Sequence, residues 1–234
     1  MVYMRFKKYM DDRIDFQPLE LAGRGKRFSE PFYNSIYDAA YDIYEMVKED
    51  IDTCKCAFWG HSMGCLILFE LVSKLIDVNK HPVHIFLSGR QAPHISYTDK
   101  KIHHLSDGEF KNEVLKYNGT PKELFECKDL ADIFLPILRA DFKIVEEYKY
   151  IKDNNKINSD LTIMFGKYDN MNREDAGSWA EYTKGACKVY ELEGDHFFIF
   201  EYEREVADII NKTLSNIQAD SLALPYKTDI SKEG

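Results

Sequence analysis

The sequence lacks long apolar runs and an excess of positive charge. No stretch of about 18 uncharged apolar residues is available to cross a bilayer, and MVYMRFKKYM at the start contains no signal-peptide apolar core. The chain has 31 lysines and arginines against 40 aspartates and glutamates, a net charge of −9. No basic surface is therefore expected to neutralise nucleic-acid phosphates or anionic lipids. We expect neither a membrane protein nor a nucleic-acid binder.

Cysteines are few, and their number is odd. The five lie scattered through apolar stretches, at Cys54, Cys56, Cys65, Cys127 and Cys187. This distribution is typical of reduced thiols in a reducing compartment. The Cys54-x-Cys56 spacing is not that of the usual zinc pairs, and no nearby Cys or His pair completes a site. The sequence thus predicts a cytoplasmic protein without a metal site.

Short apolar runs alternate with segments of helical periodicity. This pattern is typical of the α/β class, a mostly parallel sheet flanked by helices. The 234 residues suit one domain of this kind. Strands are expected at 16–21, 55–59, 84–88, 161–165 and 188–192. Covering helices are expected at 35–48, 63–75 and 197–217.

From about residue 106 to residue 150 the alternation stops. This segment has only helical patterns, with expected breaks at Gly119, Pro121 and near Pro136. A helical insertion in an α/β domain commonly forms a lid over the site at the strand ends, and extra scaffold helices are the alternative. The apolar stretch FLPILRADF favours a lid. We predict a single domain over 1–218, with a flexible tail at 219–234.

Residues 60–64, Gly-His-Ser-Met-Gly, match the G-x-S-x-G pattern between an expected strand and an expected helix. Glycines two residues before and after Ser62 would let the backbone turn sharply and expose the hydroxyl. The alternative is that Ser62 only caps an ordinary helix. A cap requires neither glycine nor a buried strand before it, so we predict that Ser62 is a nucleophile.

A serine nucleophile needs a base, and the base needs a carboxylate that fixes its tautomer. In α/β-hydrolases, where this pattern occurs, the chain order is serine, acid, histidine. His196 is the one histidine late enough, because the other six lie at or before residue 104. Asp169 follows the strand expected at 161–165, whereas Asp160 precedes that strand and would lie at the wrong edge of the sheet.

Two other aspartates are weaker choices for the acid. Asp195 adjoins His196, so its side chain is poorly placed to reach Nδ1 of that ring. Asp175 stays as a fallback, although in DAGSW it could simply cap a helix. We predict the triad Ser62, Asp169 and His196.

The sequence also resembles the type II thioesterases that accompany nonribosomal peptide and polyketide synthases. The likeness extends to about residue 215, and its motifs include PLELAGRGKRFSEP, FWGHSMG, LSGRQAPH, FLPILRADF and GDHFFIF. It implies an α/β-hydrolase fold with a helical lid, and hydrolysis of acyl groups from the phosphopantetheine arm of acyl or peptidyl carrier proteins. No cofactor beyond that arm is implied. Ser62, Asp169 and His196 fall on the family's catalytic positions.

The resemblance departs from the family at the beginning of the sequence. Family members start with a strand and a loop resembling FPYAGG, whose backbone amide forms half of the oxyanion hole. The sequence instead opens inside the expected first helix, at VYMRFKKYM. The other half of the hole, the backbone N–H of Met63, is present. A truncated gene model or fragment is one explanation, and a variant with a rearranged site is the other.

Three functions are therefore compared. The leading hypothesis is an editing thioesterase acting on carrier proteins. A small-ester esterase would differ by preferring free esters to carrier-bound thioesters. A shortened homologue that binds carrier proteins without turnover is the third hypothesis, because loss of one oxyanion donor typically costs about 10²–10³ in turnover.

Overall fold

Within the described residues, four parallel strands form one sheet. They are β1 (Ala57–His61), β2 (His84–Ser88), β3 (Leu161–Gly166) and β4 (Cys187–Leu192), in that spatial order. The computed structural model describes residues 2–95, 100–151 and 156–222, with side chains up to residue 217. Because every neighbouring pair is parallel, the four strands end at the same edge of the sheet.

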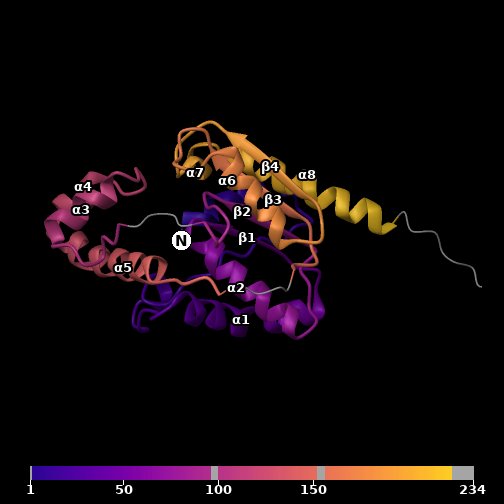
Figure 1. The fold of residues 1–234 in the computed structure, drawn as a ribbon, viewed down its shortest axis with the longest axis horizontal. Coiled ribbons are helices and arrows are strands. Elements are labelled where there is room, and N and C mark those ends of the chain that lie inside the picture. Colours follow the sequence, from indigo (N-terminus) through magenta and orange to yellow (C-terminus); the bar gives the residue numbers. More distant parts are fainter. Residues whose placement is uncertain (1, 96–99, 152–155, 223–234) are drawn as a thin grey trace, which may run out of the picture.

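Helices cover both faces of the sheet (Figure 1). On one face lie α1 (Ile36–Thr53) and α2 (Met63–Asp77); on the other lie the 3₁₀ helix η1 (Val2–Tyr9), α7 (Phe198–Glu201) and α8 (Glu203–Leu222). On β2, Ile85 and Leu87 join the core of the first face, and Phe86 joins the core of the second. Burying each such side chain stabilises the fold by roughly 1.5–3 kcal/mol. This explains why β2 is apolar throughout its middle instead of alternating.

Local signals set the ends of several helices. The Ser35 hydroxyl accepts the backbone N–H of Asp38 and caps α1, at a distance of 3.0 Å. Two short elements connect β3 to β4: the helix α6 (Arg173–Gly177) and the 3₁₀ helix η3 (Ser178–Tyr182). Another 3₁₀ turn, η2 (Gly25–Arg27), lies in the N-terminal loop. Trp179 of η3 is fully buried and donates its indole N–H to the Arg90 carbonyl at 2.8 Å.

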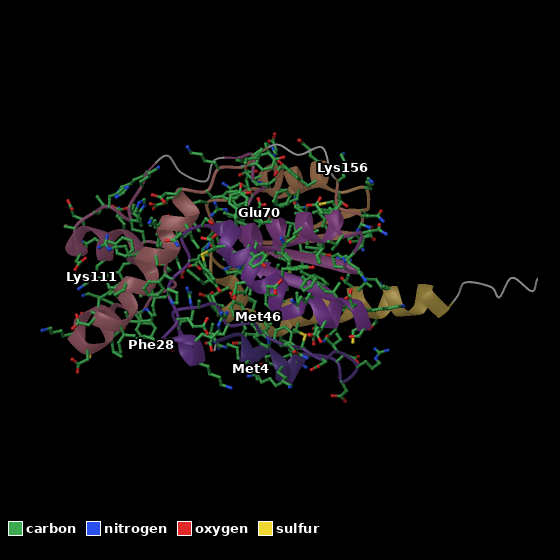
Figure 2. The ribbon with its side chains drawn as sticks, turned by 90° about the horizontal axis from the view of Figure 1, so that it is seen from below. Met4, Phe28, Met46, Glu70, Lys111 and Lys156 are labelled. Carbon is green, nitrogen blue, oxygen red and sulfur yellow. The ribbon has the colours of Figure 1, made fainter. Side chains whose placement is uncertain are left out.

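The helical insertion consists of α3 (Asp107–Leu115), α4 (Lys122–Glu126) and α5 (Lys128–Glu146), which extend to one side of the sheet (Figure 1). Figure 2 shows the same arrangement from another side, with Lys111 on the insertion and Glu70 on α2. The insertion has a small apolar core of its own around Phe110 and Val114. Arg24 in the N-terminal loop ties α5 to the domain through two hydrogen bonds to Asp141, of 2.7 and 2.8 Å.

The strand predicted at 16–21 is wrong. The segment is extended and its exposure alternates along the chain, but it forms no ladder of hydrogen bonds. An alternating pattern becomes a strand only when a neighbouring strand offers donors and acceptors, and Pro18 has no N–H to offer. The other four predicted strands are present, with ends shifted by at most two residues.

The predicted break near Pro136 is also wrong, because α5 continues through that residue. A proline inside a helix removes one backbone hydrogen bond, and here the turns on both sides retain theirs and bury Ala131, Ile137 and Ile144. The helix predicted at 197–217 is divided at Tyr202 into α7 and α8. The helix α8 continues to Leu222, past the predicted start of the tail, and residues 223–234 lie outside the described residues.

Among the described helices, none combines the length and the apolar character that crossing a bilayer requires.

Candidate active site

Ser62 lies on a sharp turn between β1 and α2. Its backbone dihedrals are φ 52° and ψ −116°, a conformation that costs a non-glycine residue about 1–3 kcal/mol. At Gly60 an added Cβ would lie 2.5 Å from the Gly64 carbonyl oxygen, so the turn closes only with glycine there. A Cβ at Gly64 would meet nothing within 4 Å. The predicted need for glycine therefore holds before the serine, whereas after it the structure shows no steric reason for glycine.

The Ser62 hydroxyl does not cap the helix that it precedes. Ser62 occupies the N-cap position of α2, yet its side chain makes no capping hydrogen bond. Its oxygen lies 2.9 Å from Nε2 of His196 instead. Ser62 therefore has the chain position of an N-cap, but its side chain does not act as one.

His196 joins Ser62 to Asp169. Its Nδ1 lies 2.9 Å from Oδ2 of Asp169, and the side chains of His196 and Asp169 are only 8% and 2% exposed. The other carboxylate oxygen, Oδ1, accepts the Asn170 backbone N–H at 2.7 Å. Asp169 is thereby held facing the ring, and we assign the proton to Nδ1 of His196, which leaves Nε2 to accept from the serine hydroxyl. The structure brings the three predicted residues together in one hydrogen-bonded relay.

The other aspartates have different partners. Asp175 accepts the Asn172 backbone N–H at 3.1 Å in a capping box of α6. Asp195 accepts the backbone N–H of Phe197 at 2.9 Å and the side-chain amide of Asn118 at 3.0 Å. Asp160 lies at the opposite end of β3 and accepts the Ala186 N–H at 2.8 Å. None of these three is hydrogen-bonded to the His196 ring, in keeping with the sequence-based choice of Asp169.

Two glycines at the strand ends make room for the His196 loop, and sequence reasoning did not single them out. Gly166 ends β3, and a Cβ there would lie 2.2 Å from the Asp195 carbonyl oxygen. Gly89 follows β2 with φ 65°, and a Cβ there would lie 2.7 Å from Cε1 of the His61 ring. In the sequence, each of these glycines directly follows an expected strand, which indicates a close approach of the backbone. The sequence does not show which distant segment approaches it.

His61 was also missed as a neighbour of the base. Its buried ring lies 5.3 Å from the His196 ring, centroid to centroid, and its Nδ1 lies 3.0 Å from the Ser88 hydroxyl. Burial, and next the proximity of His196, lower the pKa of His61 well below its ordinary value. The ring is therefore neutral, so it fills the space behind His196 without opposing a positive charge there.

The N-terminus of α2 faces the reacting position. Met63 is the first residue of α2, and the first N–H groups of a helix have no acceptor within it. These N–H groups and the helix dipole favour negative charge next to Ser62. The sequence predicted that the backbone N–H of Met63 donates to the oxyanion. Met63 has the position that this role requires, and the role itself stays a prediction.

The helical insertion contacts the His196 loop. The Tyr117 ring lies 6.1 Å from the His196 ring, and the Asn118 side chain binds Asp195. At Gly119, an added Cβ would lie 1.9 Å from the Phe197 ring. The segment after α3 therefore packs directly against the residues on either side of the base.

The thiol nearest the site is unreactive. Cys65 is fully buried one turn after Ser62 and donates its S–H to the carbonyls of Gly60 and Ser88. Burial raises the pKa of this thiol to about 12.

Among the described residues, a single group of three side chains could hold a metal ion, namely His103, His104 and Glu147, and it lies at the base of the insertion.

Comparison with known proteins adds three findings. A family model described as "Thioesterase domain" matches residues 1–214. The linear gramicidin dehydrogenase LgrE of Brevibacillus parabrevis is 36% identical over 220 residues, 92% of this chain and 83% of that protein. The gramicidin S biosynthesis protein GrsT of Aneurinibacillus migulanus is 34% identical over 226 residues, 94% of this chain and 86% of that protein.

A solved structure is similar over almost the whole chain. ClbQ from the colibactin NRPS/PKS pathway superposes with a TM-score of 0.87 at 28% identity, covering 93% of this chain and 92% of ClbQ. The similarity therefore includes the sheet, the covering helices and the insertion together.

Proposed function

This chain belongs to the thioesterase domain family, as a serine hydrolase of the type II thioesterase class, and we propose that it removes acyl groups from the phosphopantetheine arm of acyl or peptidyl carrier proteins. Such hydrolysis frees nonribosomal peptide or polyketide synthases whose arms are blocked by an unsuitable acyl group. GrsT is named for gramicidin S biosynthesis and ClbQ for an NRPS/PKS pathway, which supports this class of substrate. The observation on which the proposal depends is the Asp169–His196–Ser62 relay.

The first half of the reaction transfers the acyl group to the enzyme. Nε2 of His196 takes the hydroxyl proton while Oγ of Ser62 attacks the thioester carbonyl carbon. The carbonyl oxygen becomes an oxyanion at the N-terminus of α2, where the Met63 N–H is one donor. The C–S bond then breaks, and His196 returns the proton to the sulfur, which leaves a free phosphopantetheine thiol and an acyl ester on Ser62.

Water completes the cycle. His196 takes a proton from a water molecule that attacks the ester carbonyl carbon, and then returns this proton to Oγ of Ser62. The products are a carboxylic acid and the free enzyme. Asp169 keeps the ring in the required tautomer and stabilises the imidazolium in both halves. The chain supplies nucleophile, base and orienting carboxylate, so we propose that the hydrolysis itself needs no cofactor.

Two other functions are separated by experiment. A small-ester esterase would hydrolyse free esters faster than carrier-bound thioesters, and a carrier-binding homologue without turnover would bind and not hydrolyse.

The name of LgrE refers to a dehydrogenase. A dinucleotide site of the G-x-G-x-x-G type would support hydride transfer, but the twelve glycines of this sequence nowhere have that spacing.

The proposed setting is the cytoplasm, where carrier-protein synthases work. All five cysteines are free, as a reducing compartment would require. The proposed partners are carrier domains, and we propose no nucleic-acid or membrane partner.

The decisive test is release of acetyl and longer acyl groups from a loaded carrier protein, followed by mass spectrometry of the carrier. We expect release to fall by at least about 10⁴-fold in Ser62→Ala. Ser73→Ala is the matched control, because Ser73 is also in α2 but its hydroxyl binds the Phe69 carbonyl. Unchanged release in Ser62→Ala would contradict the assigned nucleophile, and faster turnover of free esters would favour the esterase.

A further inference from the structure

Three potential metal ligands meet where the insertion joins the domain. We call this place the neck; it consists of residues 102–105, which precede α3, and Glu146 and Glu147 at the end of α5. The ligand atoms of His103, His104 and Glu147 all lie within 4.8 Å of one another. Nε2 of His103 is 3.5 Å from Oε1 of Glu147, and the two imidazole rings are 3.7 Å apart, centroid to centroid.

Glu146 prepares His103 for metal binding. Its carboxylate binds Nδ1 of His103 by a short hydrogen bond, and it also accepts the backbone N–H groups of Ile102 at 2.9 Å and of His103 at 3.2 Å. Both side chains are buried, at 5% and 4% exposure. A carboxylate on Nδ1 fixes the tautomer of the ring and leaves the lone pair on Nε2. Metal-binding histidines almost always donate their other N–H in this way, to a carboxylate, a backbone carbonyl or a water molecule.

The remaining nitrogen of His103 is buried without a partner. Nε2 has no hydrogen bond, because the nearby Glu147 oxygen is too distant or poorly aligned to form one. A buried ring nitrogen left in this state destabilises the fold, because it has lost its hydrogen bond to water without gaining another. A cation at the neck would satisfy it, and the nitrogen points toward the two groups that could complete the coordination.

From these contacts we propose that the neck binds one divalent transition-metal ion of the zinc type through His103, His104 and Glu147. Two imidazoles and a carboxylate are suitable ligands for zinc. Bonds of about 2.0–2.1 Å in tetrahedral geometry place two ligand atoms roughly 3.4 Å apart, close to the 3.5 Å between His103 Nε2 and Glu147 Oε1. His104 and Glu147 are exposed, so they can move into place, and water can occupy the fourth position.

The bound ion would fasten the beginning of the insertion to its end. Arg139 of α5 already holds the first part of the neck through the carbonyls of His103 and Leu105, at 2.5 and 2.8 Å. A metal bridge would add a second tie between residues more than forty positions apart in the chain. The insertion packs against the His196 loop, so the ion would stabilise the surroundings of the base without contacting the reacting atoms.

The proposal is tested by titrating the chelator-treated full chain with Zn²⁺ in a calorimeter, and with Co²⁺ followed by visible absorption. All proteins contain Cys54→Ser and Cys127→Ser, because these two exposed thiols are the competing zinc ligands. We expect one ion per chain and a tetrahedral Co²⁺ spectrum without thiolate bands. His104→Ala and Glu147→Gln should each weaken Zn²⁺ binding by at least about tenfold. These ligands are exposed, so both variants should fold.

Matched controls are His81→Ala and Glu126→Gln, an exposed histidine and an exposed glutamate outside the cluster, which should bind Zn²⁺ like the parent. The proposal is overturned if no saturable binding occurs, or if both ligand variants bind as the parent does. Nitrogen-15 spectra of the His103 ring provide a second measurement. We expect the Nε2 resonance of His103 to shift on addition of Zn²⁺, and ring resonances that Zn²⁺ leaves unchanged would equally overturn the proposal.

Discussion

The catalytic relay and the neck use the same pair of groups. In each, a buried carboxylate binds Nδ1 of a buried histidine, Asp169 with His196 and Glu146 with His103. The two sites differ in what faces Nε2. At the sheet edge it is the hydroxyl of Ser62 at 2.9 Å, whereas at the neck it is a glutamate at 3.5 Å with no hydrogen bond. The histidine–carboxylate pair is thus common to both sites. The group that faces Nε2 decides whether the histidine activates a nucleophile or offers its lone pair to a cation.

The two pairs are also supported differently. His196 lies over the ends of parallel strands, in space left by glycines such as Gly166, so rigid backbone sets its position. His103 lies in a connecting segment and is positioned by the side chains of Glu146 and Arg139. A base that must meet a hydroxyl within tenths of an ångström benefits from the first kind of support. A metal ligand tolerates the second kind, because the ion itself completes the geometry.

The largest expected effect comes from replacing the carboxylate of each histidine pair, Asp169 in the relay and Glu146 at the neck, by its amide. Asp169→Asn keeps the shape but favours the wrong His196 tautomer, so we expect kcat to fall by about 10⁴-fold. Glu146→Gln makes the same change at the neck, and we expect Zn²⁺ affinity to fall by about 10- to 100-fold. Stopped-flow hydrolysis and calorimetry measure the two quantities.

The control for the first change is Asp175→Asn. That carboxylate was the fallback acid in the sequence, and the structure places it in the capping box of α6. Turnover in Asp175→Asn should stay near that of the parent. A comparable loss of turnover in Asp175→Asn and Asp169→Asn would contradict the assignment of the acid.

The next effect tests the rigid support of the nucleophile. Gly60→Ala places a Cβ 2.5 Å from a backbone carbonyl oxygen and must displace the Ser62 turn, so we expect turnover to fall by about 10²-fold or more. Gly64→Ala adds a Cβ in open space inside α2, where alanine is favoured over glycine by up to about 1 kcal/mol. Its melting temperature should not fall. Equal losses in kcat for the two variants would show that the turn does not depend on Gly60 in particular.

The sequence predicted the site better than it predicted its surroundings. Ser62 followed from the G-x-S-x-G pattern between a strand and a helix, His196 from the chain order of α/β-hydrolases, and Asp169 from its position after a strand end. The strand predicted at 16–21 failed because pairing depends on a partner strand, which a single segment does not reveal. The contacts of His61 with His196, and of His103 with Glu146, join residues far apart in the chain, so no local pattern indicates them.

A third histidine gives a smaller effect, through pH. Burial lowers the pKa of His84 to about 4, and its Nε2 lies 2.9 Å from the Thr162 hydroxyl. The unfolded chain takes up this proton near pH 6.5, whereas the folded chain does so only near pH 4. The free energy of unfolding is therefore greatest above pH 6.5 and declines as the pH falls to 4, by roughly 1–3 kcal/mol from this group. Urea unfolding at several pH values should show a shallower decline in His84→Gln, and an identical decline would contradict the assigned role.

The smallest effect concerns the hydrogen bond from Asn118, in the insertion after α3, to Asp195 beside the base. Asn118 has φ 57°, a conformation that glycine also adopts easily, so Asn118→Gly removes the side chain without straining the backbone. We expect a loss of about 0.5–1.5 kcal/mol at this contact and a fall in kcat/KM of no more than about tenfold. Asn118→Ala adds backbone strain to the same deletion and should lose more. If Asn118→Gly instead matched the large loss of Asp169→Asn, the contact between insertion and loop would be as important for the position of His196 as the carboxylate is.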